Sequence, residues 1–231
     1  MGAFDRVAAL YGPRFGGISS GRVAVFGVGG VGGWCAECLA RSGVGHLTLV
    51  DFDKVEETNV NRQVMATAKT VDLPKVEVLA ARLKEINPAI SLAVFPSRYT
   101  KETATSFDLE GHHAIVDAID SVPDKADLIR HALSLEGTEL FSAMGAALRF
   151  DPRRVRTDLF SRIEGDPLAR ALRHTFRRTG GIPERPFMCA WSDERVSRPA
   201  GSTTLASAMQ VTAAMGLNLA HLVLERLAAM Q

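Results

Sequence analysis

The chain has 231 residues, of which 46% are hydrophobic and 23% are charged, and its formal net charge is +1. This balance is typical of a folded globular protein and excludes a disordered or collagen-like chain. No apolar run is long enough to span a membrane, and the first ten residues lack an apolar signal core, so neither membrane insertion nor secretion is expected. Three cysteines form no disulfide framework, which favours a cytoplasmic location.

Strand and helix patterns alternate through the first 145 residues, beginning at a short β-branched run, Arg22–Phe26. Four further apolar runs and three segments with apolar residues at helical spacing follow it. The alternation predicts a doubly wound, mostly parallel, Rossmann-like α/β fold with helices on both faces of the sheet. The predicted strands are 22–26, 46–50, 91–95, 114–116 and 140–141, and the predicted helices are 34–41, 74–86 and 123–135.

The rest of the chain differs in composition and is expected to add a helical and loop extension to this fold. Residues 149–231 carry a formal charge of +5, against −4 for residues 1–148, and they contain arginine but no lysine. Arg170, Arg173 and Arg177 lie on one face of a predicted helix, because they are spaced by three and four residues. The elements predicted here are a helix over 166–178, a loop over 180–202 and a final helix over 204–230.

A glycine pattern joins the first predicted strand to the first predicted helix. It reads Gly27-x-Gly29-x-x-Gly32, and Asp51 ends the second strand 24 residues after Gly27. Glycines there let backbone N–H groups approach a phosphate at a helix N-terminus, and an acidic side chain can accept ribose hydroxyls. Taken alone, this dinucleotide fingerprint indicates NAD, and a tight turn without a ligand is the alternative. The sequence contains no Walker loop.

The residues that follow Asp51 favour a nucleoside triphosphate over NAD. A polar segment, Asn59–Gln63, stands where a dehydrogenase has a simple second helix, and Lys75 lies in the first turn of the next helix. A cation at that position opposes the helix dipole unless a polyphosphate binds nearby. Asp120 follows another predicted strand, where a carboxylate facing a polyphosphate indicates Mg²⁺. The alternatives are a solvated lysine and a helix-capping aspartate.

Five motifs occur in one register over residues 22–121: GVGGVGGW, LVDFDKVEETNVNRQ, LPKVEVL, EINP and DAIDS. Together they resemble the ATP-dependent adenylyltransferases related to ubiquitin-activating enzymes, a family that includes the ThiF/MoeB group. Beyond them, Gly145, Asp151-Pro152 and the run from Asp166 to Ala169 resemble one branch, the tRNA threonylcarbamoyladenosine dehydratases. The resemblance continues through Cys189 and the final helix, so it covers nearly the whole chain.

This resemblance implies a role for each matched position. Arg6 matches an N-terminal arginine that reaches the phosphates bound by the other protomer of a homodimer, and it is implied to be catalytic together with Arg62, Lys75 and Asp120. The nucleotide-binding positions are Gly27, Gly29, Gly30 and Gly32 for the nucleotide, Asp51 for its ribose, Asn59, Arg62 and Lys75 for its phosphates, and Asp120 for Mg²⁺. We expect an N-terminal helical arm (1–21), an ATP-binding core (22–148) and a basic extension that completes the same domain (149–231).

The resemblance also implies a reaction. A carboxylate becomes reactive when its oxygen attacks the α-phosphate of ATP, a step that needs charge neutralisation and alignment more than a strong base. In the dehydratase branch the carboxylate belongs to threonylcarbamoyladenosine in tRNA, and a nitrogen of the same substituent then closes a ring and releases AMP. The candidates for binding tRNA phosphates are Arg149, Arg153, Arg154, Arg156, Arg170, Arg173 and Arg177. A solvated helix face or pairing with acids is the alternative.

The cysteines help to choose between branches of this family. Cys35 and Cys38 form a single CxxC pair, and two thiolates cannot close a tetrahedral zinc site, so no zinc is expected. Cys189 is interpreted as structural, with a relay nucleophile as the alternative. His112 and His113 are expected at the surface.

The sequence therefore predicts a cytoplasmic, homodimeric, ATP- and Mg²⁺-dependent enzyme that modifies tRNA without membrane association. A sulfurtransferase-type partner is left open. One alternative is an enzyme that adenylates a ubiquitin-like sulfur carrier, which the missing zinc cysteines and the arginine-rich tail disfavour. A second is an NAD(P)-dependent oxidoreductase, disfavoured by Asn59–Gln63. A third is a non-catalytic RNA-binding relative, disfavoured by the presence of Arg62, Lys75 and Asp120.

Overall fold

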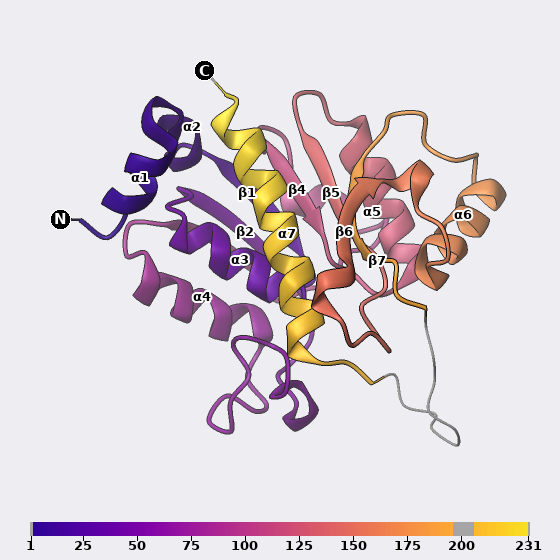
Figure 1. Cartoon of the computed structure of the whole chain (residues 1–231), viewed down its shortest axis with the longest axis horizontal. Helices are drawn as coiled ribbons and strands as arrows, with labels where there is room; N and C mark the ends of the chain where they lie inside the picture. Colours follow the sequence, from indigo (N-terminus) through magenta and orange to yellow (C-terminus); the bar gives the residue numbers. More distant parts are fainter. Residues whose placement is uncertain (1, 196–205, 231) are drawn as a thin grey trace.

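A mixed sheet with helices on both faces organises the computed structural model, which describes residues 2–195 and 206–230 (Figure 1). In the described residues the sheet has seven strands in the order β3-β2-β1-β4-β5-β7-β6, and only the β6–β7 pair is antiparallel. The strands are β1 (Arg22–Phe26), β2 (His46–Val50), β3 (Ser91–Phe95), β4 (Ala114–Asp117), β5 (Glu139–Ala143), β6 (Val155–Leu159) and β7 (Met188–Ser192). The predicted fold class is confirmed.

Two layers of helices cover the sheet. One apolar core joins the sheet to α3, α4 and α7, and a second joins it to α5 and α6. The helices are α1 (Asp5–Tyr11), α2 (Phe15–Ser19), α3 (Gly32–Arg41), α4 (Lys75–Ile86), α5 (Val122–Ser134), α6 (Pro167–Arg178) and α7 (Met209–Ala228). Short 3-10 turns are η1 (Gly12–Arg14), η2 (Glu57–Asn59), η3 (Ala104–Phe107), η4 (Pro152–Arg154) and η5 (Phe160–Arg162). None of the described helices combines the length and apolarity needed to cross a bilayer.

The central strands are apolar on both faces, as expected for parallel strands that helices cover on each side. In β1, Val23 and Val25 enter the core with α3 and α7, whereas Ala24 and Phe26 enter the core with α5 and α6. This division follows from the alternation of side chains along a strand. Burial of the strand on both faces holds its carboxyl end, where the glycine turn begins, in a fixed place.

The order of the strands creates a crevice beside β1. From β1 the chain moves outward to β2 and β3, and it then returns to the other side of β1 to form β4 and β5. Ligands of open α/β sheets bind at such a reversal, outside the carboxyl ends of the strands. The loops after β1, β2, β4 and β5 therefore converge on one edge of the sheet.

The C-terminal extension departs from the sequence prediction. Residues 180–202 were expected to be a loop, but Met188–Ser192 forms β7 between β5 and β6, so that expectation is wrong for this stretch. The strand β6 was not predicted either. Helix α7 is described from Met209, and the predicted start at residue 204 lies outside the described residues, as do residues 196–202 of the predicted loop.

Helix α7 brings the end of the chain back to the nucleotide-binding half of the fold. It packs along α3, and a Cβ added to Gly216 would lie 2.4 Å from the carbonyl oxygen of Val31. Only glycine fits at that distance. The first turns of α3 and α7 thereby lie near the same edge of the sheet.

Candidate functional site

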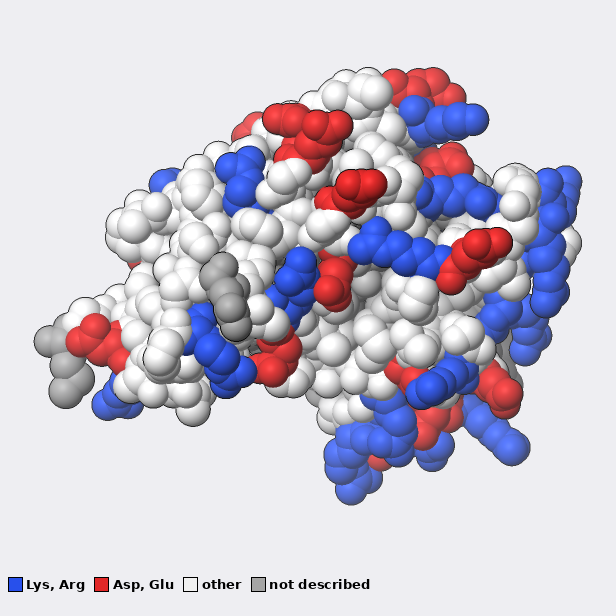
Figure 2. Space-filling model, turned by 90° about the horizontal axis from the view of Figure 1, so that it is seen from above, with Lys and Arg blue, Asp and Glu red and all other residues white. Residues whose placement is uncertain are grey.

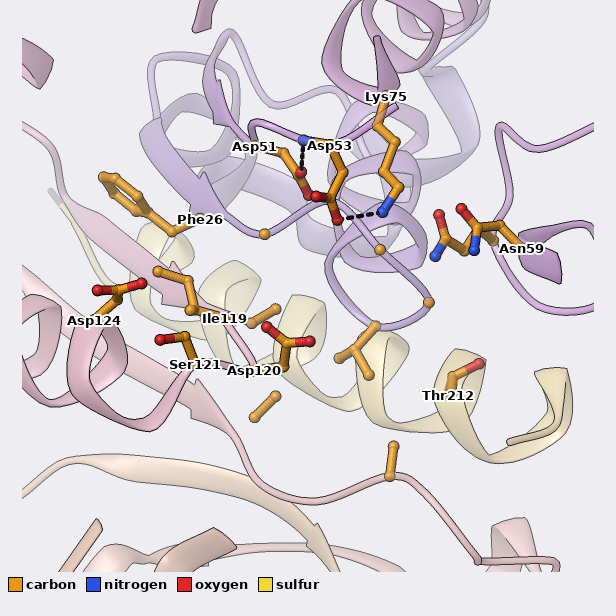
Figure 3. A pocket seen from close by; sticks show the side chains of 18 of the residues that line it. Phe26, Asp51, Asp53, Asn59, Lys75, Ile119, Asp120, Ser121, Asp124 and Thr212 are labelled. Atoms are coloured by element: carbon orange, nitrogen blue, oxygen red, sulfur yellow. Dashed lines mark hydrogen bonds and ion pairs between the residues drawn. The ribbon is translucent and has the colours of Figure 1, made fainter. Parts of the chain in front are cut away.

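A cavity of about 640 Å³ opens at the carboxyl ends of β1, β2, β4 and β5 (Figure 3). Its lining includes nearly all of the positions that the sequence singled out for a nucleotide, although they are spread over almost one hundred residues. The predicted residues that line it are Gly27, Gly29, Gly30, Asp51, Asn59, Arg62, Lys75 and Asp120. These residues line one open cavity rather than separate regions of the surface.

The glycine turn is held by close backbone contacts. Gly27 has φ of +80°, and an added Cβ would lie 2.6 Å from the carbonyl oxygen of Ala118. An added Cβ on Gly32 would lie 1.9 Å from the carbonyl oxygen of Gly27, and Gly32 is buried outside the cavity lining. Gly32 thus packs beneath the turn, and its predicted contact with the nucleotide stays a prediction. Gly29 and Gly30 remain at the cavity, beside the first turn of α3.

Asp51 links the loop after β2 to the glycine turn. Its carboxylate accepts hydrogen bonds from the backbone N–H groups of Val28 and Asp53, each at 2.8 Å. Burial raises the pKa of Asp51 above its ordinary value, although these two N–H donors act in the opposite direction. The carboxylate borders the cavity with lone pairs to spare, which suits the acceptance of ribose hydroxyls.

Polar side chains form the part of the cavity beside the glycine turn. The Arg62 guanidinium donates to the carbonyl oxygen of Thr58 at 2.8 Å, which fixes it next to the η2 turn. Lys75 begins α4, is almost wholly buried, and pairs with Asp53 at 2.7 Å between Nζ and Oδ2. A buried cation at a helix N-terminus with one carboxylate partner is suited to an anionic ligand.

Gln63 is a cavity residue to which the sequence assigned no individual role. It is 6% exposed and lines the cavity, and its Oε1 has no hydrogen-bond partner within the described residues. Buried amides normally have partners, so an unpaired one facing a cavity indicates a site built for a polar ligand. Its position in the polar segment Asn59–Gln63 was the only sequence signal for it.

The two aspartates after β4 have different surroundings. Asp117 is wholly buried and pairs with Lys125 at 2.7 Å, while the Ser142 hydroxyl donates to it at 2.6 Å. Asp120 is exposed to the cavity, and Figure 3 shows its carboxylate directed into the space that Asp51 and Lys75 face from the other side. Asp117 is thus part of the framework, and Asp120 is the carboxylate available to a ligand.

The fit to a divalent cation depends on oxygen ligands. Within the described residues no group of three or more His, Cys, Asp or Glu could hold a metal. Mg²⁺, however, is commonly held by one or two carboxylates together with phosphate oxygens and water. Asp120 offers a carboxylate of this kind, so the donor set fits Mg²⁺ that arrives with a polyphosphate and does not provide a cage for a free ion.

An aromatic wall that the sequence analysis did not find borders the same cavity. Phe52 and Tyr99 line it, and the Arg98 guanidinium stacks over the Phe52 ring at 5.4 Å while pairing with Asp124. The Tyr99 hydroxyl meets His131 Nδ1 at 3.0 Å. Flat apolar and guanidinium surfaces suit a nucleobase. Residues 97–99 lie in an irregular loop after β3, where no periodic pattern marks them.

The arginines of the extension fall into two groups. Arg149 is 3% exposed and pairs with Asp166 at 3.1 Å, so its predicted contact with tRNA phosphates is wrong. Arg173 donates to the carbonyl oxygen of Phe160 at 2.9 Å and is partly buried. Arg170 and Arg177 are exposed on α6. The pairs Arg153–Asp151, Arg154–Asp193 and Arg156–Asp193 are on the surface.

This basic region is visible as a surface feature. Figure 2 shows Lys and Arg side chains gathered at the end of the molecule where Figure 1 places α6, with a few acids among them. Surface ion pairs contribute little free energy, so the paired arginines can exchange a carboxylate for a phosphate.

The remaining predicted residues lie away from the cavity. Arg6 is exposed on α1 and does not line it. Cys189 is wholly buried, and burial raises the pKa of its thiol, so the thiolate needed by a relay nucleophile is disfavoured. His112 is buried and its Nε2 meets the Thr48 hydroxyl at 3.0 Å, so its expected surface position is wrong.

Comparison with known proteins gives a consistent match. A family description, the ThiF family, matches residues 12–225. The tRNA threonylcarbamoyladenosine dehydratase of Bacillus subtilis is 42% identical over 163 residues, which are 71% of this chain and 64% of that protein. The protein of the same name from Escherichia coli is 36% identical over 217 residues, or 91% of this chain and 80% of that one. The molybdopterin-synthase adenylyltransferase of Salmonella typhimurium is 34% identical over 69% of this chain and 61% of its own length.

Solved structures agree over the whole fold. The crystal structure of E. coli tRNA N6-threonylcarbamoyladenosine dehydratase, TcdA, in complex with AMP superposes with a TM-score of 0.93 at 33% identity, covering 98% of this chain and 94% of that one. The structure of the same protein in complex with ATP gives a TM-score of 0.92 with the same coverage. The fold thus has close counterparts among solved structures.

Proposed function

The chain belongs to the ThiF family, and on that premise we propose that it catalyses the ATP-dependent dehydration of N6-threonylcarbamoyladenosine in tRNA to a cyclic form. The observation that supports this most strongly is the convergence of Asp51, Arg62, Lys75 and Asp120 on one cavity. A relative 33% identical to this chain has been solved with ATP, which supports ATP as the ligand.

The proposed reaction has two steps. A carboxylate oxygen of the threonyl group attacks the α-phosphorus of ATP, the bond to the β-phosphate breaks, and pyrophosphate leaves. Arg62 and Lys75 neutralise the charge that develops on the leaving group. A nitrogen of the same substituent then attacks the acyl carbon and loses its proton, and AMP leaves with the carboxylate oxygen. The substrate loses one water and ATP becomes AMP and pyrophosphate, so the atoms balance.

The cavity divides naturally between the parts of the nucleotide. Asp51 accepts the ribose hydroxyls, the aromatic wall with Phe52 and Tyr99 holds the base, and the glycine turn receives the phosphates. Asp120 holds Mg²⁺, whose chemistry when bound is to neutralise phosphate charge and order the phosphate oxygens. Gln63 Oε1, which is unpaired within the described residues, is an acceptor, so it fits a hydrogen-bond donor on the ligand, such as a ribose hydroxyl.

The partners follow from the substrate. Exposed Arg170 and Arg177 on α6 contact the tRNA backbone, and a tRNA substrate agrees with a cytoplasmic location. We also propose that the chain is a homodimer, in which Arg6 of each protomer serves the cavity of the other. The exposure of Arg6 outside its own cavity supports this arrangement.

A second candidate is adenylation of a ubiquitin-like sulfur carrier. The 34% identity to a molybdopterin-synthase adenylyltransferase favours the same first step on a different carboxylate. A sulfurtransferase-type partner belongs with this second candidate. The higher identity to the dehydratases ranks it second. An oxidoreductase that uses NAD has less support, because the relatives named above are dehydratases and an adenylyltransferase.

Nucleoside mass spectrometry tests the proposed function. Purified protein is incubated with ATP, Mg²⁺ and tRNA that carries threonylcarbamoyladenosine, and the tRNA is digested to nucleosides. We expect a product lighter by one water, formed only when ATP is present, and the same protein with Asp120→Ala serves as the inactive control. Pyrophosphate release that requires a carrier protein instead of tRNA would favour the second candidate, and an absence of both products would reject the two.

A further inference from the structure

One end of the cavity has a wall without any ionisable side chain. It is formed by the segment after β5, Gly145–Ala147, together with Leu168 in the first turn of α6. The lining beside the glycine turn carries the buried cation Lys75 and the guanidinium of Arg62. The cavity is therefore divided chemically, with a charged part at the glycine turn and an apolar part at β5 and α6.

Backbone donors are available along this wall. Met144 donates its N–H to the carbonyl oxygen of Ala190, and Leu148 donates to that of Ala206. Between these two bonds, the N–H groups of residues 145–147 have no acceptor within residues 2–195 and 206–230. The side chains there are hydrogen or methyl, so a ligand can reach these donors. Successive N–H groups of this kind suit a carboxylate.

A buried network fixes the wall in place. Asp166 is 1% exposed, caps the N-terminus of α6 by accepting the Ala169 N–H at 2.9 Å, and pairs with buried Arg149 at 3.1 Å. A Cβ added to Gly145 would lie 3.3 Å from Asp166 Oδ2, so the segment after β5 packs directly against this carboxylate. The wall and the start of α6 form one rigid unit.

Helix α6 continues from the cavity to the surface. Leu168 lines the cavity, whereas Arg170 and Arg177 are exposed. At 1.5 Å per residue, these arginines lie about 3 and about 14 Å from Leu168 along the helix axis. A polynucleotide held by the exposed arginines would thus have a nucleoside within reach of the cavity.

Strand order places this wall beside the reacting groups. Strand β5 pairs with β4, so the wall after β5 adjoins the loop after β4 that carries Asp120. The ribose ligand Asp51 follows β2, on the far side of β1. A ligand on the wall therefore approaches the nucleotide from the side of Asp120, opposite the ribose.

We propose that the wall of Gly145–Ala147 and Leu168 is the acceptor subsite, which binds a purine nucleoside whose substituent ends in a carboxylate. The base packs against Leu168 and the alanine methyl groups, and the N–H groups of residues 145–147 hold the carboxylate toward Asp120. This assignment rests on the proposed function and adds to it the residues that select the acceptor. Neutral donors and apolar contacts orient the carboxylate without an ion pair that would lower its nucleophilicity.

Ala147→Leu tests the subsite, because it fills the wall without adding charge. We expect the KM for modified tRNA to rise about tenfold or more, and the affinity for ATP, measured by calorimetry without tRNA, to stay within about twofold of wild type. Ala229→Leu makes the same change at the exposed residue that follows α7 and should leave both values unchanged. If Ala147→Leu fails to fold, Leu168→Ala removes a contact instead and should raise the same KM severalfold.

Other results would overturn the assignment. A loss of ATP affinity with an unchanged KM for tRNA would place the nucleotide on this wall, and unchanged values for both would leave the wall without a ligand. A wild-type protein that turns over no modified tRNA would reject the proposed function instead. In that case the subsite is tested by comparing the affinity for modified tRNA with the affinity for unmodified tRNA, both in the presence of AMP. Ala147→Leu should abolish the difference between these two affinities.

Discussion

Asp51 connects two parts of the site at the scale of a single residue. Its carboxylate accepts one N–H from the glycine turn, at Val28, and one from its own loop, at Asp53. The same group is placed to receive the ribose, so its ionised form both shapes the turn and binds the ligand. Burial raises its pKa, so Asp51 takes up a proton at a higher pH than an exposed aspartate does.

A pH dependence of ATP binding follows from this raised pKa. As the pH is lowered from about 7 toward about 4, Asp51 should gain a proton before an ordinary aspartate does, and ATP affinity should fall. The free energy of unfolding changes in the opposite sense. A raised native pKa adds stability that is fully present below the unfolded pKa and is lost as the pH rises through the native pKa. The protonation of Asp51 therefore does not itself unfold the protein, and a thermal unfolding measurement over the same pH range separates the two effects.

Calorimetric titration across this range, together with thermal unfolding, provides the measurement. Asp51→Asn cannot ionise and should bind ATP weakly, without the pH step of the wild type. A variant that retained the same step would assign the titration to a different group.

Individual site residues could be predicted where local pattern determines their position. Asp51 and Asp120 follow strands, and Lys75 opens a helix, so their convergence at one sheet edge follows from the topology. Residues that depend on distant partners could not be placed. Arg149 was expected to bind tRNA because its partner Asp166 is 17 residues away and no sequence pattern joins them.

At the scale of elements, the first turns of α5 hold the loop that carries Asp120. The Lys125 ammonium is wholly buried, pairs with Asp117 at 2.7 Å, and donates to the carbonyl oxygen of Ile119 at 3.1 Å. Asp117 in turn accepts the Ile119 N–H at 3.1 Å. These bonds tie the loop to both β4 and α5.

Lys125→Met should distinguish the effect of Lys125 on the stability of the fold from its effect on the position of the loop that carries Asp120. The variant leaves Asp117 buried without its cation, and the free energy of unfolding should fall by about 3–5 kcal/mol. Adding Asp117→Leu removes the unpaired charge, so most of the stability should return. Both variants lose the Lys125 bond to the Ile119 carbonyl oxygen, so kcat should stay at least about tenfold low in both. Chemical denaturation and turnover, measured in parallel, record the two effects. Recovery of kcat together with stability would limit Lys125 to a structural role.

Helix α6 gives a second prediction at this scale. Replacement of Arg170 and Arg177 by Glu should weaken tRNA binding and flatten the slope of log affinity against log salt by about one to two, because each lost phosphate contact accounts for about 0.7–0.9. ATP affinity should not change. The double variant Lys69→Glu, Lys101→Glu alters net charge equally at other exposed positions and serves as the control. An unchanged salt slope in the α6 variant would remove this helix from the tRNA interface.

At the scale of the whole molecule, the sheet includes strands from both halves of the chain. The five strands of the first half could be predicted because their apolar runs alternate with helices. Strands β6 and β7 could not, since VRTDL mixes polar with apolar residues and MCAWS lies within a stretch rich in Gly, Pro and Arg. Their pairing is set by the sheet edge that β5 offers. Tertiary context outweighs local propensity at such an edge.

The homodimer proposal is a prediction about the assembly. Arg6→Ala and Asp120→Ala should each be nearly inactive alone. If Arg6 serves the partner's cavity, random mixing after subunit exchange gives half the molecules as mixed dimers with one intact site each, or about one quarter of wild-type activity. Activity that stays at the average of the two variants would show that Arg6 does not act across an interface.

The central claim is that a carboxylate of the substrate attacks the α-phosphate of ATP in this cavity. Transfer of an isotope tests it most directly, with tRNA whose threonylcarbamoyl carboxylate carries ¹⁸O and with mass spectrometry of the nucleotide products after a single turnover. We expect one ¹⁸O atom in AMP for each cyclic nucleoside formed. Label in inorganic phosphate, or AMP without label, would contradict it.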